Sequence, residues 1–297
     1  MTAFVLLHGF AQTPASWDEV VRRLQAAGHR TYVPDLYEDK GDLKLSSGEG
    51  ALADGKDDAD AAATVSAMGA ADATGTARSA CDPLASLGAV CDRVAAIVRL
   101  IAQVDGAPVL GGYSMGGRIA AETEVRHPDL PLAGLVLESA GLGPSDEAAR
   151  ATLAERNAAW ARRLREEGVA AFMDWWETLP LFATQRDLPS EVCAAIRAER
   201  TSRDAEPLAR SLEAWGAHHQ ADEAATLSAL AELANRDVPV LYLAGALDEK
   251  YAAVAACVRA AGLPGMLVPD AGHNVHLEAL STFVEIVEGV LAEGALA

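Results

Sequence analysis

The feature that most constrains the fold of this chain is a glycine-rich segment around one serine, Gly112-Tyr113-Ser114-Met115-Gly116. An apolar run from Ala107 leads into this segment, and an amphipathic stretch continues to His127. This order is typical of the strand, sharp turn and helix that form a nucleophile elbow. The turn strains the serine backbone, so only glycine fits two positions before and after it. Ser114 is therefore the candidate nucleophile or base, although a glycine-rich turn with an incidental serine would share the pattern.

Length and charge restrict the kinds of protein that this can be. At 297 residues, the chain is long enough for one large α/β domain with an inserted lid and too short for several ordinary domains. Its 43 acidic and 24 basic side chains give a formal net charge of -19. Phosphate-binding surfaces need clustered Lys and Arg, so we expect neither nucleic acid nor a membrane as a partner. An anionic substrate would need local basic groups. We expect a monomer or a small homo-oligomer.

The opening residues and the cysteines favour a cytoplasmic protein. The chain opens Met-Thr-Ala-Phe-Val-Leu-Leu-His-Gly, without a basic region followed by a long apolar one, and no later run reaches membrane-spanning length. The four cysteines are Cys81, Cys91, Cys193 and Cys257. Their spacing matches neither a Cys-x-x-Cys pair nor a metal-ligand cluster, which favours reduced thiols, with a Cys81–Cys91 disulfide as the weaker alternative.

The sequence before the serine contains two expected strands and one unusual segment. Apolar runs at Ala3 to Leu7 and Thr31 to Val33 are typical of strands buried in a parallel sheet, and a helix is expected between them from Ser16 to Ala27. Residues 38–84 are largely Ala, Asp, Gly, Ser and Lys, too poor in large apolar groups to offset the entropy of ordering them. We expect a flexible inserted loop there, solvated and mobile rather than a partner-binding element.

Elsewhere strands and helices alternate, with one interruption. Further strands are expected at Leu132 to Glu138, Val238 to Gly245 and Gly265 to Val268, and further helices at Leu84 to Ala102, Tyr251 to Ala261 and Leu277 to Leu291. From Glu147 to Asn235 the spacing is helical throughout. The pattern predicts an α/β fold: a mostly parallel sheet with helices on both faces, formed by residues 1–140 and 237–297, and an inserted helical lid of residues 141–236.

Two later strand ends carry the partners that a catalytic serine needs. Asp248 follows the strand that ends near Gly245, and His273 follows the strand that ends at Val268. The order Ser114, Asp248, His273 is the chain order of the triad in the α/β-hydrolase fold. In such a triad, His273 takes the serine proton while Asp248 holds the ring tautomer and stabilises the imidazolium.

The neighbouring acids and histidines are weaker candidates. Asp270 is an alternative acid, and His276 is an alternative base. The pairs His273 with His276 and His218 with His219 have no third ligand nearby, so we expect no metal. The sequence contains no pattern that calls for a cofactor.

Two backbone N–H groups are candidates for an oxyanion hole. Phe10 follows the first strand, in the position that supplies one donor in a hydrolase-like sheet. Met115, directly after the serine, would supply the second donor. His8, two residues before Phe10, is expected to be structural.

Several longer motifs narrow the resemblance to one family of this fold. They are Gly-Tyr-Ser-Met-Gly-Gly-Arg at 112–118, Leu-Val-Leu-Glu-Ser-Ala at 135–140, Pro-Leu-Phe-Ala-Thr-Gln at 180–185, Asp-Glu-Lys-Tyr at 248–251 and Ala-Gly-His-Asn-Val-His-Leu-Glu at 271–278. Together they resemble the 2-succinyl-6-hydroxy-2,4-cyclohexadiene-1-carboxylate synthases of menaquinone biosynthesis, over most of the chain except Glu38 to Leu84. The triad motifs occur throughout the superfamily and indicate only the fold. The Gly-Gly-Arg, Pro-Leu-Phe-Ala and Val-His-Leu-Glu stretches are more specific and indicate this one family.

This resemblance implies a lyase rather than a hydrolase. In that family the triad abstracts a proton from the ring of 2-succinyl-5-enolpyruvyl-6-hydroxy-3-cyclohexene-1-carboxylate, pyruvate is eliminated, and no acyl-enzyme forms. The substrate is a small anion with several carboxylates, which arginine binds bidentately. By position, the resemblance implies that Arg118 and Arg200 bind carboxylates and that Tyr113 and Trp175 line the pocket. For each arginine, a solvated surface charge is the alternative.

The chain departs from the family at one expected cation. A lid-helix arginine of the family falls at Leu153 here, and Arg150, one turn earlier, is the candidate substitute.

Two other functions are compatible with these residues. A carboxylesterase or another acyl hydrolase would use the same triad, because only the pocket distinguishes it from the lyase. Basic groups in the pocket favour the lyase, and an apolar pocket favours the esterase. A non-catalytic binding protein on the same scaffold is the third alternative, and the complete set of triad residues argues against it.

Overall fold

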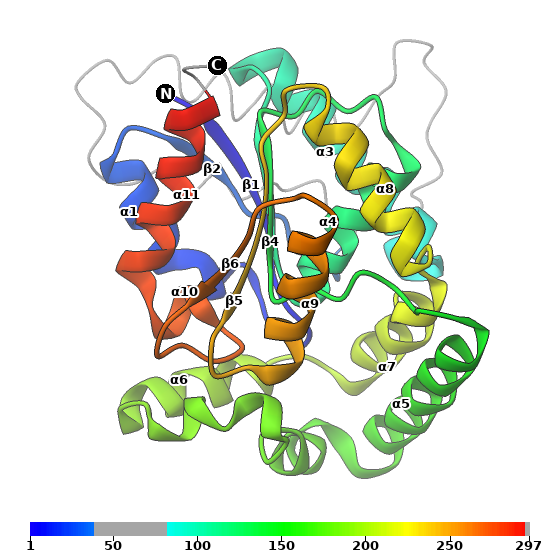
Figure 1. The fold of residues 1–297 in the computed structure, drawn as a ribbon. Helices are drawn as coiled ribbons and strands as arrows, with labels where there is room; N and C mark the ends of the chain where they lie inside the picture. The colour runs from blue at the N-terminus through cyan, green and yellow to red at the C-terminus, as the bar shows by residue number, and fades with distance from the viewer. Residues whose placement is uncertain (39–81, 295–297) are drawn as a thin grey trace, which may run out of the picture.

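Six parallel strands form one sheet in the computed structural model, which describes residues 1–38 and 82–294. They are β1 (Ala3–Leu7), β2 (Arg30–Tyr32), β3 (Val109–Tyr113), β4 (Gly134–Glu138), β5 (Val240–Gly245) and β6 (Gly265–Val268). Their order across the sheet is β2-β1-β3-β4-β5-β6 (Figure 1). All six strands form where the sequence predicted them, so the predicted parallel α/β fold is confirmed.

Helices cover both faces of this sheet (Figure 1). One face carries α1 (Asp18–Ala26) and α11 (Leu280–Gly294), which follows the short α10 (Val275–Glu278). The other carries α3 (Leu87–Asp105), α4 (Met115–Arg126), α8 (Glu223–Ala234) and α9 (Glu249–Ala260). The helix predicted from Leu84 begins three residues later, because the Ser86 side chain caps it by accepting from the N–H of Ala89 at 3.0 Å.

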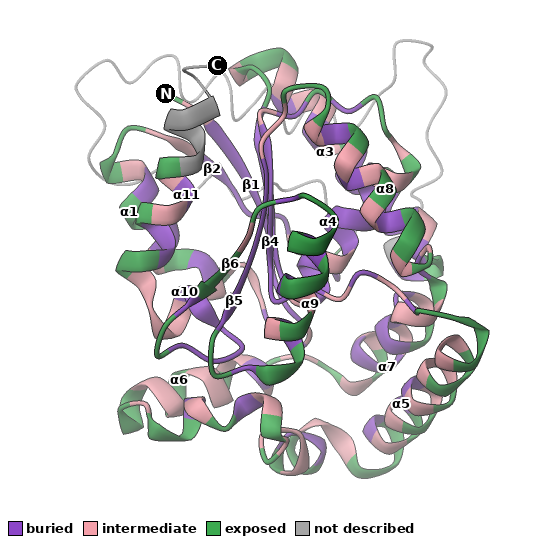
Figure 2. Cartoon of the chain, viewed as in Figure 1, coloured by how far each residue is buried: buried purple, intermediate pink, exposed green. Residues whose placement is uncertain are grey.

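Strands β1, β3, β4 and β5 are buried on both faces, which explains their continuous apolar runs, whereas Met266 and Leu267 of the edge strand β6 are exposed (Figure 2). In β1, Phe4 and Leu6 pack into the layer beneath α1 and α11, whereas Val5 and Leu7 pack into the layer beneath α3 and α4. This alternation follows from the two-residue period of a strand. Each of these four central strands therefore contributes to two separate hydrophobic layers.

Three helices between β4 and β5 lie across the carboxyl end of the sheet, and we call them the lid helices (Figure 1). They are α5 (Glu147–Trp176), α6 (Ser190–Arg200) and α7 (Ala205–Ala214), with short 3-10 turns at Pro180–Phe182, Thr184–Asp187 and Ala217–His219. Gly168 interrupts α5 with φ 79° and ψ 167°. The stretch predicted to be helical is helical, while its division from the core as a separate lid domain stays a prediction.

Some expectations fall outside the described residues. The predicted flexible insertion lies almost wholly within residues 39–81, and Cys81 lies there too. Cys91, Cys193 and Cys257 are free thiols. In the part of the chain that the structure describes, no helix combines the length and the apolar character needed to cross a lipid bilayer.

Candidate active site

Ser114 lies at the sharp turn between β3 and α4. Its φ of 52° and ψ of -105° strain a residue that has a side chain. Its N–H donates to the carbonyl oxygen of Glu138 at 2.8 Å, which ties the turn to β4. A Cβ at Gly112 would lie 2.5 Å from the backbone of Gly116, and a Cβ at Gly116 would lie 2.2 Å from the carbonyl oxygen of Leu7. Both positions therefore require glycine.

Ser114, His273 and Asp248 form a hydrogen-bonded chain at the carboxyl end of the sheet. The Nε2 atom of His273 lies 3.0 Å from Ser114 Oγ, and its Nδ1 atom lies 2.7 Å from Asp248 Oδ2. The other oxygen of Asp248 accepts from the N–H of Tyr251 at 3.2 Å, which holds the carboxylate at the start of α9. The structure thus brings the three predicted residues together, and it pairs His273 with Asp248 rather than with the exposed Asp270.

The environment of His273 keeps its imidazole neutral. Burial lowers the pKa of His273 below its ordinary value of 6.5, and this effect outweighs the hydrogen bond and the charge of Asp248, which raise it. A neutral ring at neutral pH has a free lone pair on Nε2 when its Nδ1–H donates to the carboxylate. The arrangement can accept a proton from Ser114.

The two expected oxyanion donors border the space above the serine. Phe10 and Met115 both line the cleft that contains Ser114. Met115 is the first residue of α4, so its N–H has no acceptor within the helix. Neither N–H has an acceptor among the turn, loop and cap hydrogen bonds of the described backbone.

A cleft of about 490 Å³ separates Ser114 from the lid helices. Its apolar wall includes Phe10, Leu153, Trp160, Trp176, Leu181 and Leu212. Its charged lining residues are Arg118, Arg156, Lys250 and Glu223. Cations therefore predominate in this cleft although the whole chain carries a formal charge of -19.

Arg118 and Arg156 are cations without a carboxylate partner within 4 Å among residues 1–38 and 82–294. Arg118 donates to the carbonyl oxygen of Trp215 at 2.9 Å, and Arg156 lies 4.5 Å above the ring of Trp160. Burial lowers the pKa of both guanidinium groups, and the charge of Arg156 lowers the pKa of Arg118 further. Two partly desolvated cations side by side favour an anion between them.

Arg156, an arginine that none of the sequence motifs includes, lines the cleft from α5. Leu153 lines the cleft, and Arg156 lies one turn after it on the same face of α5. Arg150, the expected substitute, is absent from the lining, because its guanidinium donates to the carbonyl oxygens of His218 and Gln220 at 2.6 and 2.8 Å. The signal was present in the sequence, since positions three apart share a helix face.

Three residues expected in the pocket do not line the cleft. Arg200 is 5% exposed, and its guanidinium donates to Gln185 at 2.8 Å and to Glu177 at 3.3 Å. Trp175 is not among the lining residues; its neighbour Trp176 is, because successive helix residues point about 100° apart. Tyr113 is 4% exposed. Its ring centroid lies 5.2 Å from that of His273, so it packs against the triad rather than lining the cleft.

His276, the alternative base, is held elsewhere. Its Nδ1 atom lies 2.7 Å from Glu138 Oε2, and its backbone N–H donates to Glu138 Oε1 at 3.0 Å. Both side chains are buried. In the described ranges, 1–38 and 82–294, no group of three His, Cys, Asp or Glu side chains is arranged to hold a metal ion.

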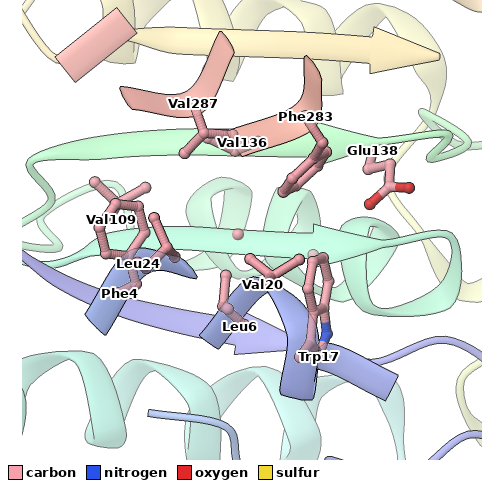
Figure 3. A pocket seen from close by; sticks show the side chains of 12 residues that line it. Phe4, Leu6, Trp17, Val20, Leu24, Val109, Val136, Glu138, Phe283 and Val287 are labelled. Atoms are coloured by element: carbon pink, nitrogen blue, oxygen red, sulfur yellow. The ribbon is translucent and has the colours of Figure 1, made fainter. Parts of the chain in front are cut away.

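A second cavity, shown in Figure 3, lies within the layer beneath α1 and α11. Its volume is about 10 Å³, and its lining is apolar apart from Glu138 at one end. That volume corresponds to roughly one water molecule, so this cavity is no site for a substrate.

A profile described as the alpha/beta hydrolase family matches residues 4–286. The chain belongs to the alpha/beta hydrolase family. The resemblance drawn from the elbow and triad motifs is confirmed at this level.

Within this family, named relatives point to one branch. The 2-succinyl-6-hydroxy-2,4-cyclohexadiene-1-carboxylate synthase of Enterobacter sp. (strain 638) is 34% identical over 169 residues, covering 57% of this chain and 60% of that protein. The synthase of Klebsiella pneumoniae (strain ATCC 700721 / MGH 78578) is 34% identical over 182 residues, covering 61% and 67%. The chain therefore spans 60% to 67% of the length of these curated relatives.

Solved structures support the fold. MenH from S. aureus superposes with a TM-score of 0.74 at 24% identity, covering 99% of this chain and 94% of that one. A thermophilic esterase from Thermogutta terrifontis gives 0.66 at 23% identity, covering 99% and 90%. Because enzymes of different activity share the fold, the activity depends on the pocket.

Proposed function

We propose that the protein is a lyase that eliminates pyruvate from 2-succinyl-5-enolpyruvyl-6-hydroxy-3-cyclohexene-1-carboxylate. The observation that carries the proposal is the pair Arg118 and Arg156, which line the cleft above Ser114 and have no carboxylate partner among the described residues. A substrate with several carboxylates supplies the missing anions. The names of the curated relatives point to the same reaction.

The proton transfer begins at His273. Its neutral Nε2 atom, 3.0 Å from Ser114 Oγ, takes the serine proton, and the serine oxygen removes a proton from a ring carbon of the substrate. Asp248 stabilises the imidazolium through Nδ1–H at 2.7 Å. Ser114 thus acts as a base and forms no bond to carbon.

The electron pair left on carbon must be stabilised until the leaving group departs. It spreads onto a substrate carbonyl, whose oxygen the N–H groups of Phe10 and Met115 would bind. The pair then forms a double bond to the neighbouring ring carbon, the existing ring double bond shifts by one position, and the bond to the enolpyruvyl oxygen breaks. The leaving group takes up a proton and becomes pyruvate, so atoms and electrons balance.

The experiment supplies the purified protein with this substrate and follows pyruvate through a lactate dehydrogenase coupled assay. A short-chain p-nitrophenyl ester is assayed in parallel. We expect pyruvate release to exceed ester hydrolysis by far in kcat/KM, and both to depend on Ser114. Ester hydrolysis without pyruvate release would assign the site to an acyl hydrolase instead.

A further inference from the structure

The loop that carries the first oxyanion donor is contacted at its two ends by the lid helices and between them by Tyr37 and Arg203. This loop, which we call the oxyanion loop, comprises Phe10 to Thr13 between β1 and α1. Ala11 has φ 59°, a left-handed conformation that is unfavourable for a residue with a side chain. Such a loop keeps its shape only when its surroundings hold it.

The carboxyl-terminal end of α6 binds the far end of this loop. Glu199 Oε1 accepts from both the N–H and the hydroxyl of Thr13, at 2.8 and 2.9 Å. Arg203, three residues after α6, donates through Nε to the carbonyl oxygen of Gln12 at 3.0 Å. Its Nη2 donates to Asp35 at 2.6 Å. Burial alone raises the pKa of Asp35, but hydrogen bonds and charges from His8 and Arg203 outweigh it and hold this pKa well below its usual range.

The remaining contacts come from α5 and from Tyr37, which α7 contacts in turn. The ring of Phe10 lies 5.2 Å from that of Trp176 and 6.4 Å from that of Phe172, both on α5. The N–H of Ala11 donates to the hydroxyl of Tyr37 at 3.3 Å. That hydroxyl accepts from Ser211 of α7 at 3.5 Å, and Arg203 lies 4.6 Å above the Tyr37 ring.

We propose that Glu199 and Arg203 are positioning residues that orient the Phe10 N–H toward the developing oxyanion. The position of these two residues on the lid side therefore determines how well the oxyanion hole stabilises the transition state. The inference rests on the proposed function only in assuming that an oxyanion forms beside Ser114. Both residues act through the loop, and neither lines the cleft. Loss of one oxyanion donor costs an enzyme about 10²- to 10³-fold in kcat, so misplacing one costs a sizeable part of that factor.

The test uses variants of the two residues that contact the oxyanion loop from the lid side. Glu199→Leu and Arg203→Met remove the two contacts, and Glu199→Gln keeps an oxygen acceptor for Thr13. Arg165→Met is the matched control, because Arg165 joins α5 to α7 through Glu206 and Glu213 without touching the oxyanion loop. Each variant is assayed for pyruvate elimination, p-nitrophenyl ester hydrolysis and the rate at which a fluorophosphonate labels Ser114. In that labelling, the serine oxygen bonds phosphorus, fluoride leaves, and the serine proton passes to His273.

We expect Glu199→Leu and Arg203→Met to lower the labelling rate and kcat about tenfold or more, with KM for the ester within about twofold. Glu199→Gln should recover most of the lost rate, and Arg165→Met should match the unmutated protein. If the role were purely structural, the variants would unfold at a lower temperature. In assays well below that temperature, they would not show a loss of kcat at a nearly constant KM.

Unchanged labelling in both Glu199→Leu and Arg203→Met would overturn the inference, as would an equal loss in Arg165→Met. If one variant does not fold, the other still decides. Failure of the unmutated protein to react with the fluorophosphonate would also contradict it, because no working oxyanion hole would exist. Absence of pyruvate release with the expected labelling pattern would instead reject the proposed reaction and leave this inference standing.

Discussion

Ser114 combines a strained backbone with two main-chain anchors. Its N–H is bound by the carbonyl oxygen of Glu138, and its own carbonyl oxygen accepts from the N–H of Arg118 at 3.0 Å. The side chain is thus left with His273 as its hydrogen-bond partner. An unactivated serine hydroxyl is a weak base and a weak nucleophile, so the reactivity of Ser114 depends on its position beside His273.

The first prediction concerns the triad as a unit. Ser114→Ala, His273→Ala and Asp248→Asn should each lower kcat for pyruvate elimination by about 10³-fold or more, and pairs of these substitutions should lose little beyond the larger single loss. Steady-state kinetics and circular dichroism of each variant check this. Additive losses in the double variants would show that the three residues act independently.

The second prediction concerns pH. Because burial lowers the pKa of His273 below 6.5, the ring stays neutral to more acidic pH than a solvated histidine. The base is active when neutral, so kcat/KM should fall as pH drops through a value below 6.5 and should be level just above neutrality. A pH–rate profile of kcat/KM measures this value. If kcat/KM instead fell at acidic pH with a midpoint above 6.5, burial would not be the main influence on the pKa of His273.

The third prediction concerns the two unpaired arginines. Arg118→Ala and Arg156→Leu should each lower kcat/KM for the anionic substrate by about ten- to a hundredfold, because a charge-assisted hydrogen bond contributes roughly 1.5–3 kcal/mol. Hydrolysis of an uncharged ester should change only a few-fold. Lysine should restore part of each loss, since it lacks the bidentate fork. The combined change Leu153→Arg with Arg156→Leu, which moves the cation by one turn, should restore activity partly.

Arg200 serves as the contrast in the same assays. It donates to Glu177 and Gln185 and does not line the cleft, so we expect Arg200→Ala to act through packing. Its losses on the anionic substrate and on the ester should be similar. A loss confined to the anionic substrate would return Arg200 to the role that the resemblance implied.

At the scale of elements, the elbow depends on how closely β3, α4 and β1 approach one another. Our fourth prediction is that Gly116→Ala strongly destabilises the protein, because its Cβ would lie 2.2 Å from the Leu7 carbonyl oxygen, and backbone cannot move aside as a side chain can. Gly289→Ala on α11 is the matched control, since within residues 1–38 and 82–294 nothing beyond its own turn of helix lies within 4 Å of the added Cβ. That change should stabilise the helix by about 0.5–1 kcal/mol. Urea unfolding of both variants measures the difference.

At the scale of the whole molecule, the two parts of the core are joined beside the active site. Glu138 ends β4 before the lid helices, and His276 follows β6 after them. Their side chains pair in the interior at 2.7 Å, while the Glu138 carbonyl oxygen binds the Ser114 N–H. One glutamate therefore contacts both the serine turn and the segment that carries His273.

The fifth prediction follows from this buried pair. His276→Ala should lower the free energy of unfolding by roughly 3–5 kcal/mol, because Glu138 is left buried without its partner. The control is His127→Ala, whose pair with Asp92 is exposed and contributes at most about 1 kcal/mol. Chemical denaturation checks both. Loss of activity in a His276→Ala protein of unchanged stability would instead give this histidine a role in the chemistry.

The sequence by itself determined the fold, and it predicted the set Ser114, Asp248 and His273 that the fold brings within hydrogen-bonding distance. Parallel strands buried on both faces need continuous apolar runs, and the elbow needs glycines at fixed offsets from Ser114, so both leave local patterns. The tertiary structure decided the binding groups, because a cation's role depends on what lies opposite it. Arg150 and Arg156 look alike in sequence, yet the carbonyl oxygens of His218 and Gln220 engage the first and leave the second facing the cleft. The hydrogen bond between Glu199 and Thr13 joins residues that are 186 positions apart in the sequence, and no local sequence pattern predicts such a contact.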